Sequence, residues 1–137
     1  MTCIFCAIVT GDLPATRIAE TDHALAFMDI NPATRGHALV IPKQHAADLM
    51  EIDEDDLAHC AVLAKRIGRR ALDQLGADGV NLVNSCGTAA WQTVFHFHIH
   101  VVPRYAGKDG LELPWVPTPG DPVVIAEAAA ALRETLD

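Results

Sequence analysis

The sequence predicts an α+β domain built on a mainly antiparallel sheet. Strand-like segments follow one another through short turns, one long amphipathic helix interrupts them, and strands do not alternate with helices as they do around parallel sheets. The chain has 137 residues, half of them apolar, which suits one compact domain and is short for two. We therefore predict a single domain over residues 1–137, with a core over about 3–104 and a proline-rich tail plus C-terminal helix over 105–137.

Short apolar segments bounded by turn residues predict the strands of this sheet. The first two form a hairpin at Thr21 and Asp22, and Pro103 ends the last strand. Between the third and fourth strands, apolar residues from about 53 to 75 recur at spacings of three and four, which indicates an amphipathic helix that stops at Gly76. In chain order, the predicted strands cover residues 15–21, 23–30, 37–43, 79–84 and 93–102.

The two ends of the chain are harder to assign. Residues 3–11 fit either a short helix or an extended segment that Gly11 and Pro14 close. Residues 109–122 contain four of the eight prolines, which excludes a regular element. Asp121 followed by Pro122 is typical of a helix start, so we predict a final helix to about residue 136.

Composition and charge exclude several classes of partner. The formal net charge is −8 and no long basic run is present, which argues against a nucleic-acid polymer, although backbone amides could still bind one small phosphate ester. No signal-like leader and no stretch of about 20 apolar residues is found, so we expect a cytoplasmic protein without a membrane partner. In that compartment four cysteines are reduced thiols or metal ligands more often than disulfides.

Three of the seven histidines occupy alternate positions of one predicted strand, in the segment "QTVFHFHIHVVPRY" over residues 92–105. Side chains alternate between the two faces of a strand, so these histidines should share one face while apolar residues share the other and face the core. The histidines are His96, His98 and His100, and the apolar set is Phe95, Phe97, Ile99 and Val101.

Three interpretations of these histidines compete: a solvated polar face, a metal site, and a nucleophilic imidazole flanked by two others that orient it or bind anionic oxygens. The preceding loop "SCGTAAWQT" favours the third. Its small residues let backbone N–H groups approach phosphate oxygens, and Gln92 and Thr93 add donors. Taken alone, that loop is equally well an ordinary connection between strands.

Three segments together resemble the histidine triad (HIT) superfamily. "HFHIHVV" has its His-x-His-x-His pattern with apolar residues between and after the histidines, and "AFMDINP" and "RGHALVIPKQH" resemble its upstream segments in order and spacing. The resemblance runs from about Cys3 to Arg104 and is strongest to the Hint-like branch of bacterial members. It implies a HIT-like fold with a five-stranded, mainly antiparallel sheet, one long helix and short or C-terminal helices, and it implies a homodimer.

The resemblance also implies an activity, that of a nucleotide hydrolase or phosphoramidase acting at the α-phosphate of nucleoside 5′-monophosphate derivatives, with purines preferred. His98 would be the nucleophile that forms a covalent nucleotidyl-histidine, and no catalytic metal would be required. His100 would donate to the phosphate and serve as a proton source, and His37 would support the site. The alternatives are a nucleotide-binding or signalling module with vestigial activity, and a metal-dependent hydrolase that uses the triad as ligands.

Further positions match the family's substrate site. Asp29 resembles the carboxylate that accepts the ribose hydroxyls. Trp91 stands where a small residue is common and could narrow the leaving-group side. Relatives usually have Asn eleven residues before the first triad histidine, where this chain has Ser85 and places Asn84 one earlier. The apolar walls around the base would be Phe5, Ile8, Phe27, Ile30 and Leu39, and the phosphate loop would contribute Asn84, Ser85, Gln92 and Thr93.

Cys3 and Cys6 form a C-x-x-C motif, which supplies half of a tetrahedral zinc site. The resemblance implies that His45 and His96 complete it, so that His96 would brace the strand while His98 performs the chemistry. The two thiols could instead be a redox pair or simply buried. Cys60 lies on the apolar stripe of the long helix and is predicted to be core.

Overall fold

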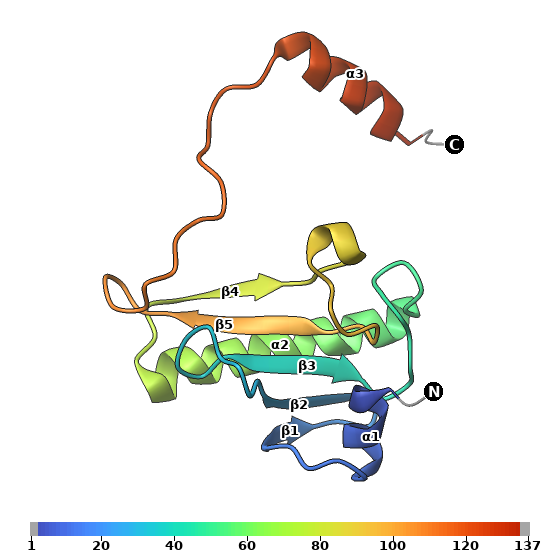
Figure 1. Ribbon diagram of the computed structural model, residues 1–137, viewed down its shortest axis with the longest axis vertical. Helices are drawn as coiled ribbons and strands as arrows, with labels where there is room; N and C mark the ends of the chain where they lie inside the picture. The colour runs from blue at the N-terminus through green and yellow to red at the C-terminus, as the bar shows by residue number, and fades with distance from the viewer. Residues whose placement is uncertain (1–2, 135–137) are drawn as a thin grey trace.

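The structure is a computed structural model that describes residues 3–134. Within that range it has the α+β architecture expected from the sequence (Figure 1). The strands are β1 (Arg17–Glu20), β2 (Ala24–Met28), β3 (Ala38–Pro42), β4 (Gly79–Val83) and β5 (Ile99–Arg104). The helices are α1 (Ile4–Thr10), α2 (Glu54–Leu75) and α3 (Pro122–Leu132), with a 3₁₀ turn, η1 (Thr88–Ala90). The predicted end of the last helix, near residue 136, lies outside the described residues.

The five strands form one antiparallel sheet in the order β1-β2-β3-β5-β4. The expected hairpin joins β1 and β2, and the hydroxyl of Thr21 accepts hydrogen bonds from the N–H groups of His23 and Ala24 at its turn. The long helix α2 crosses one face of the sheet and the short helix α1 lies on the other (Figure 1). Antiparallel pairing places His100 of β5 directly opposite Leu39 of β3.

The central strands β2 and β3 are buried on both faces, because each face has its own apolar cluster. Alternate residues follow the two faces, as the pleat of a strand requires. Beneath α2 lie Ala24, Ala26, Ala38, Val40, Phe97, Ile99 and Val101, packed on Cys60, Leu63, Ala64 and Ile67. On the α1 face lie Leu25, Phe27, Leu39 and Ile41, packed on Phe5 and Ile8.

Local signals explain the helix ends. Asp53 caps α2 by accepting from the N–H of Asp55, and Gly76 ends it in the left-handed conformation, φ 70°, which glycine adopts without strain. Residues 3–11 resolve as a helix, α1, with Cys3 as its N-cap residue. The Arg17 guanidinium donates to the carbonyls of Ile8 and Val9 near the end of α1.

The predicted strand over 93–102 is wrong in its first half. β5 begins only at Ile99 and runs through Pro103 to Arg104. Before it, the Phe97 N–H donates to the carbonyl of Ala46 at 2.7 Å, and the Asn84 side chain donates to the carbonyl of His98 at 2.9 Å. A loop carbonyl and a side-chain amide thus replace ladder partners. Phe95, expected on the core face, is 49% exposed, because it precedes the paired part of the strand.

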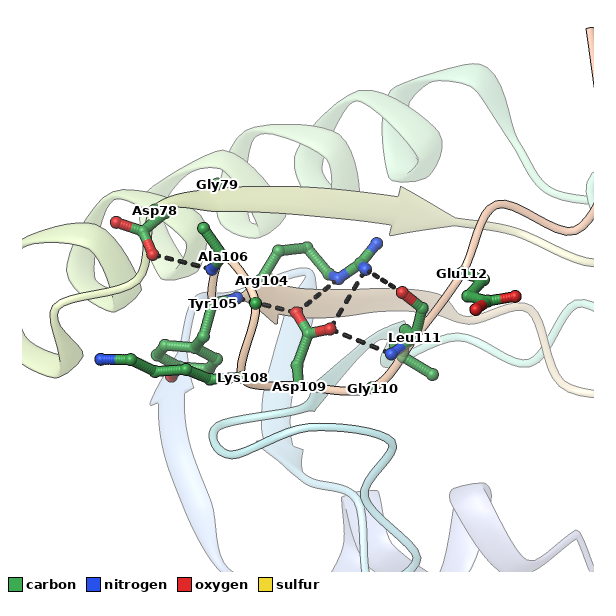
Figure 2. A pocket seen from close by; sticks show the side chains of 11 residues that line it. Asp78, Gly79, Arg104, Tyr105, Ala106, Lys108, Asp109, Gly110, Leu111 and Glu112 are labelled. Carbon is green, nitrogen blue, oxygen red and sulfur yellow. Dashed lines mark hydrogen bonds and ion pairs between the residues drawn. The ribbon is translucent and has the colours of Figure 1, made fainter.

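The chain turns sharply after β5, and Figure 2 shows how that turn is held. The Asp109 carboxylate accepts from the Arg104 guanidinium at 2.9 Å and from the N–H groups of Tyr105 and Leu111. These bonds hold the pKa of Asp109 well below its usual range. The turn lines a cavity of about 460 Å³ whose polar groups bond largely to one another.

Beyond this turn an irregular arm leads to α3, which stands clear of the sheet (Figure 1). The apolar side chains of the arm and of α3 are exposed. Trp115 of the arm is 65% exposed and Ile125 of α3 is 58% exposed. None of the helices within residues 3–134 combines the length and the apolar character that a bilayer crossing needs.

Candidate functional site

His98 is buried, 6% exposed, and its Nδ1 lies 2.8 Å from the carbonyl oxygen of His96. A carbonyl can only accept a hydrogen bond, so Nδ1 carries the proton and the lone pair is on Nε2. The main chain thus fixes the tautomer of His98. An imidazole held this way has a nucleophilic nitrogen in a defined position.

His37 and His100 form a second tautomer-fixed pair. The N–H of Ala33 donates to His37 Nδ1 at 2.9 Å, so the proton of His37 is on Nε2. That Nε2 lies 2.9 Å from Nδ1 of His100, which must accept and therefore keeps its own proton on Nε2. Asp29 lies beside this pair, with Oδ2 at 3.4 Å from His37 Nε2. His37, expected from the sequence only to support the site, bonds directly to His100.

Burial sets the charge of this pair. It lowers the pKa of His37, against the opposing pull of the Asp29 carboxylate. Burial, with smaller contributions from the imidazoles of His98 and His37, lowers the pKa of His100 to about 4. Both rings are therefore neutral at pH 7 and can donate hydrogen bonds without carrying charge.

An apolar cavity of about 340 Å³ lies on the α1 face of the sheet, and its wall residue Phe5 connects it to His98, which does not itself line it. The Phe5 ring forms one wall and meets the His98 ring edge-on, with centroids 5.3 Å apart. Ile30 forms an exposed part of the lining, at 90% exposure. All six residues predicted for the ribose and the base line this cavity, namely Phe5, Ile8, Phe27, Asp29, Ile30 and Leu39. The sequence carried no signal for Leu13, Pro14, Ala15 and Val94, which also line it.

Asp29 is a polar residue of this cavity that retains free acceptor capacity. Its Oδ1 accepts from the N–H of Asn31 at 2.8 Å, and Oδ2 lies near His37. A carboxylate offers about four lone-pair sites, so it can accept further hydrogen bonds from a ligand.

The loop before the histidines is organised differently from the expectation. Gln92 is 3% exposed, and both N–H groups of its amide bond the carbonyls of Ala47 and Val94, while its oxygen accepts from the N–H of Gly87. The Gln92 amide therefore braces the loop and has no N–H left for a phosphate. Thr93 lines a different cavity, of about 480 Å³, together with Cys3 and His45.

Asn84 and Ser85 lie where the loop meets the histidine segment. The Asn84 amide nitrogen holds the His98 carbonyl, and its Oδ1 is buried with no hydrogen-bond partner among residues 3–134. Ser85, the next residue in the chain, is also buried. Trp91, later in the same loop, has a left-handed backbone, φ 75°, which is strained for a residue other than glycine, and its indole is 73% exposed.

A second constellation brings together Cys3, Cys6, His45 and His96, which we name the cysteine–histidine cluster. Their ligand atoms all lie within 4.8 Å of one another. The Cys3 sulfur is 3.3 Å from Nδ1 of His96, and the Cys6 sulfur is 3.3 Å from Nδ1 of His45. These are the four residues expected from the sequence to converge.

The ring of His96 is oriented for this cluster by a main-chain acceptor. Its Nε2 lies 2.9 Å from the carbonyl oxygen of Pro42, so Nε2 carries the proton and Nδ1 faces the thiols with its lone pair. A histidine that donates its far nitrogen to a carbonyl is the usual arrangement of a metal ligand. Two thiols and two imidazoles form a donor set that suits tetrahedral zinc.

A third grouping, Asp29, His37 and His100, also places potential ligand atoms within 4.8 Å. Here the near nitrogens are already used, because His37 Nε2 and His100 Nδ1 bond one another at 2.9 Å. An ion would have to break that bond, so this grouping suits a hydrogen-bond relay better than a metal.

Known proteins share this fold and sequence pattern. A protein of Schizosaccharomyces pombe named adenosine 5′-monophosphoramidase hnt1 is 40% identical over 122 residues, 89% of this chain and 89% of that protein. The crystal structure of a HIT-family protein from Bacillus subtilis matches with a TM-score of 0.84 and 35% identity, covering 99% of this chain and 100% of that one. The structure of a zinc-bound histidine triad family protein from Mycobacterium smegmatis matches with a TM-score of 0.78 and 43% identity, covering 96% and 98%. A family model described as the HIT domain matches residues 10–107, and the chain therefore belongs to the HIT family.

Proposed function

We propose that this chain is a nucleotide hydrolase that cleaves nucleoside 5′-monophosphate derivatives at the α-phosphate, with His98 as the nucleophile. The observation that carries the proposal is the fixed tautomer of His98, which leaves a lone pair on Nε2 of a ring that packs against Phe5, a wall of the apolar cavity. The monophosphoramidase name of the S. pombe relative supports a phosphoramidate, with a P–N bond, as the substrate class.

In the first step, the lone pair on His98 Nε2 attacks the α-phosphorus while the bond to the leaving amine breaks. The ring then carries a positive charge, which the bond from Nδ1 to the His96 carbonyl stabilises. His100, whose Nδ1 accepts from His37, donates a hydrogen bond from its Nε2–H to the phosphoryl oxygens. The departing amine takes its proton from solvent water and leaves as a neutral amine.

In the second step, water attacks the nucleotidyl-histidine. The water gives up its proton to bulk solvent, the bond between phosphorus and His98 Nε2 breaks, and a nucleoside monophosphate is released. His37 keeps Nε2 of His100 directed at the reacting groups, because its own bond to His100 Nδ1 holds that ring.

The remaining residues bind the nucleoside. The aromatic and aliphatic walls of the cavity suit a planar base and read its shape more than its hydrogen-bonding edge, so we propose purines with weak discrimination between them. Asp29 accepts the ribose hydroxyls with its free lone pairs. The buried Oδ1 of Asn84 is the one acceptor near His98 that still lacks a partner among residues 3–134.

We also propose a structural zinc at the cysteine–histidine cluster, supported by its donor set and by the zinc-bound relative. When bound, the ion would supply a fixed tetrahedral link between the N-terminal segment and the histidine segment. Protein purified without an affinity tag should contain about one zinc per chain. Cys3→Ser combined with Cys6→Ser should remove it, whereas Cys86→Ser, outside the cluster, should not.

A homodimer is proposed on the exposed edge of the sheet. β4 is an edge strand, its Leu82 and Val83 are 51% and 39% exposed, and Leu82 shares a shallow cavity with Leu72 of α2. Two copies that paired through β4 would cover this apolar surface. Val83→Lys should shift the sedimentation of the protein toward the monomer. Ile18→Lys, on the opposite edge strand β1, is the matched control and should leave the mass unchanged.

Hydrolysis of adenosine 5′-phosphoramidate tests the function directly. Wild type should release AMP in the presence of chelator, and His98→Ala should lower kcat by at least about a thousandfold while AMP binding changes little. His59→Ala, on the exposed side of α2, is the matched control and should retain the wild-type rate. An AMP adduct on His98, trapped by alkaline quench and located by mass spectrometry, would support the covalent step. Binding of AMP without turnover by wild type would favour a nucleotide-binding module instead.

A further inference from the structure

The cysteine–histidine cluster and the apolar cavity are joined by one short helix. Cys3 is the N-cap residue of α1 and Cys6 lies in its first turn, so both thiols of the cluster belong to this element. Phe5 and Ile8, from the same seven-residue helix, line the cavity. Any shift of α1 that moves the thiols therefore moves a wall of the cavity.

Residue 96 forms a second link between the two sites. Its imidazole presents Nδ1 to the cluster, and its main-chain carbonyl accepts the hydrogen bond that fixes the tautomer of His98. The Phe5 ring bridges the same two histidines, with centroids 5.9 Å from His96 and 5.3 Å from His98. The position of residue 96 thus sets both a cluster ligand and the orientation of His98.

A helix of seven residues is too short to be stable without tertiary contacts. At its C-terminal end, the Arg17 guanidinium holds the carbonyls of Ile8 and Val9. At its N-terminal end, the polar side-chain contacts to other elements that the described residues offer are those of the cluster, and the Phe5 ring packs against Phe27 and the two histidines. An ion that fixed all four ligands would tie α1, the segment after β3 and the histidine segment together.

We propose that occupancy of the cysteine–histidine cluster by zinc is linked to nucleotide binding at the apolar cavity. The zinc-bound protein binds a nucleoside monophosphate more tightly than the metal-free protein, and the nucleotide-bound protein binds zinc more tightly than the free protein. Linkage requires the two effects on affinity to be equal in size. This inference rests on the proposed nucleotide and zinc sites and adds the coupling between them.

Calorimetric titration with AMP tests the coupling. Zinc-loaded wild type, freed of excess ion, and chelator-treated wild type should differ in the Kd for AMP by about fivefold or more, with the metal-free protein weaker. Equal affinities, within about twofold, would overturn the linkage while leaving both sites in place. Failure of AMP to bind either form would overturn the proposed function together with the linkage. Failure of zinc to bind would overturn the zinc site and the linkage, and AMP binding would still support the nucleotide site.

A second measurement starts from the folded, zinc-loaded protein, in case the metal-free form loses its structure. The Kd for zinc, measured by competition with a coloured chelator of known affinity, should fall by about fivefold or more when AMP is saturating. An unchanged Kd for zinc, with AMP shown to bind, would overturn the inference.

Two variants separate this coupling from zinc acting elsewhere. The double variant Cys3→Ser with Cys6→Ser should bind AMP with the same affinity whether or not zinc is added. A zinc response in that variant equal to the wild-type response would overturn the inference, because the ion would then act at Asp29, His37 and His100 or on the nucleotide itself. Cys86→Ser, which leaves the cluster intact, should respond to zinc as wild type does.

Discussion

His96 and His98 are two residues apart and both are buried, yet the chain presents opposite nitrogens of the two rings. His96 donates from Nε2 to the Pro42 carbonyl and directs Nδ1 at two thiols. His98 donates from Nδ1 to the His96 carbonyl and keeps Nε2 free in a ring that packs against Phe5, a wall of the apolar cavity. The same side chain thus fits a metal ligand at one position and a nucleophile at the other.

The comparison shows that the main-chain carbonyl next to a buried imidazole determines which ring nitrogen carries the proton and which one is free to bind or react. Burial also lowers the pKa of His96, against the opposing effect of the Pro42 carbonyl. A neutral ring with one nitrogen occupied has only one nitrogen left to use. Variants that disturb the two positions separately should therefore have separate consequences.

The largest expected contrast is between His98→Ala and His96→Ala. His98→Ala should abolish turnover and retain about one zinc per chain. His96→Ala should lose the zinc and lower the free energy of unfolding by about 2–4 kcal/mol, because it empties a site that is 0% exposed. Metal analysis and urea unfolding followed by circular dichroism measure both effects. Loss of zinc from His98→Ala would contradict the division of roles.

A smaller effect concerns the pH dependence of stability. In the folded protein the pKa of His100 is lowered from its ordinary value near 6.5 to about 4. Between pH 6.5 and pH 4 the unfolded chain therefore binds more protons than the folded protein does. Stability should therefore be fully present above pH 6.5 and fall as the pH drops toward 4, by on the order of 2 kcal/mol. His37, whose pKa is also lowered, acts in the same direction.

His100→Gln tests this pH effect. Urea unfolding at several pH values, with chelator present so that zinc release does not contribute, should show a flatter dependence in the variant. The slope is the informative quantity, because the loss of the bond to His37 also lowers stability at every pH. A slope equal to that of wild type would refute the role of His100.

Asn84→Ala should have a more modest effect. It removes the side-chain hydrogen bond to the His98 carbonyl, which replaces a ladder partner before β5, and should cost about 1 kcal/mol of unfolding free energy. Asn81→Ala is the matched control, because Asn81 accepts from Arg104 at an exposed position and should cost less. Equal losses in the two variants would argue against a special role for Asn84.

Trp91→Gly should have the smallest effect, an increase in the free energy of unfolding. Glycine adopts the left-handed conformation of Trp91 without strain, so the variant should be more stable by about 0.5–1 kcal/mol. Trp91→Ala keeps the strain and should not gain. If the indole narrows the leaving-group side, Trp91→Gly should also accept bulkier amines, measured as kcat/KM across a series of phosphoramidates.

The sequence predicted the elements whose signals are local. The helix over 53–75 was correct because its apolar spacing, its Asp53 cap and its terminal Gly76 all lie within the segment. The histidine segment was assigned as strand too early, since pairing depends on what lies opposite. A periodicity of two cannot show that Phe97 bonds to Ala46 instead of a neighbouring strand.

Side-chain convergence could be predicted by resemblance, and main-chain partners could not. The four residues of the cysteine–histidine cluster were named before the structure placed them together. The carbonyls of Pro42 and His96, which select the free nitrogens, have no sequence signature because every residue has one. For the same reason the sequence predicts that Gln92 reaches a ligand, whereas the main-chain carbonyls of Ala47, in the segment after β3, and of Val94 take up both of its N–H groups.

The exposure of Trp91 has a practical consequence for spectroscopy. The chain has two tryptophans, and the other, Trp115, lies on the exposed arm. Intrinsic fluorescence therefore comes from a loop and a tail, and a fluorescence melt would miss the unfolding of the sheet. The same property makes emission a reporter of events at the surface, and a change on adding nucleotide would be assigned to Trp91.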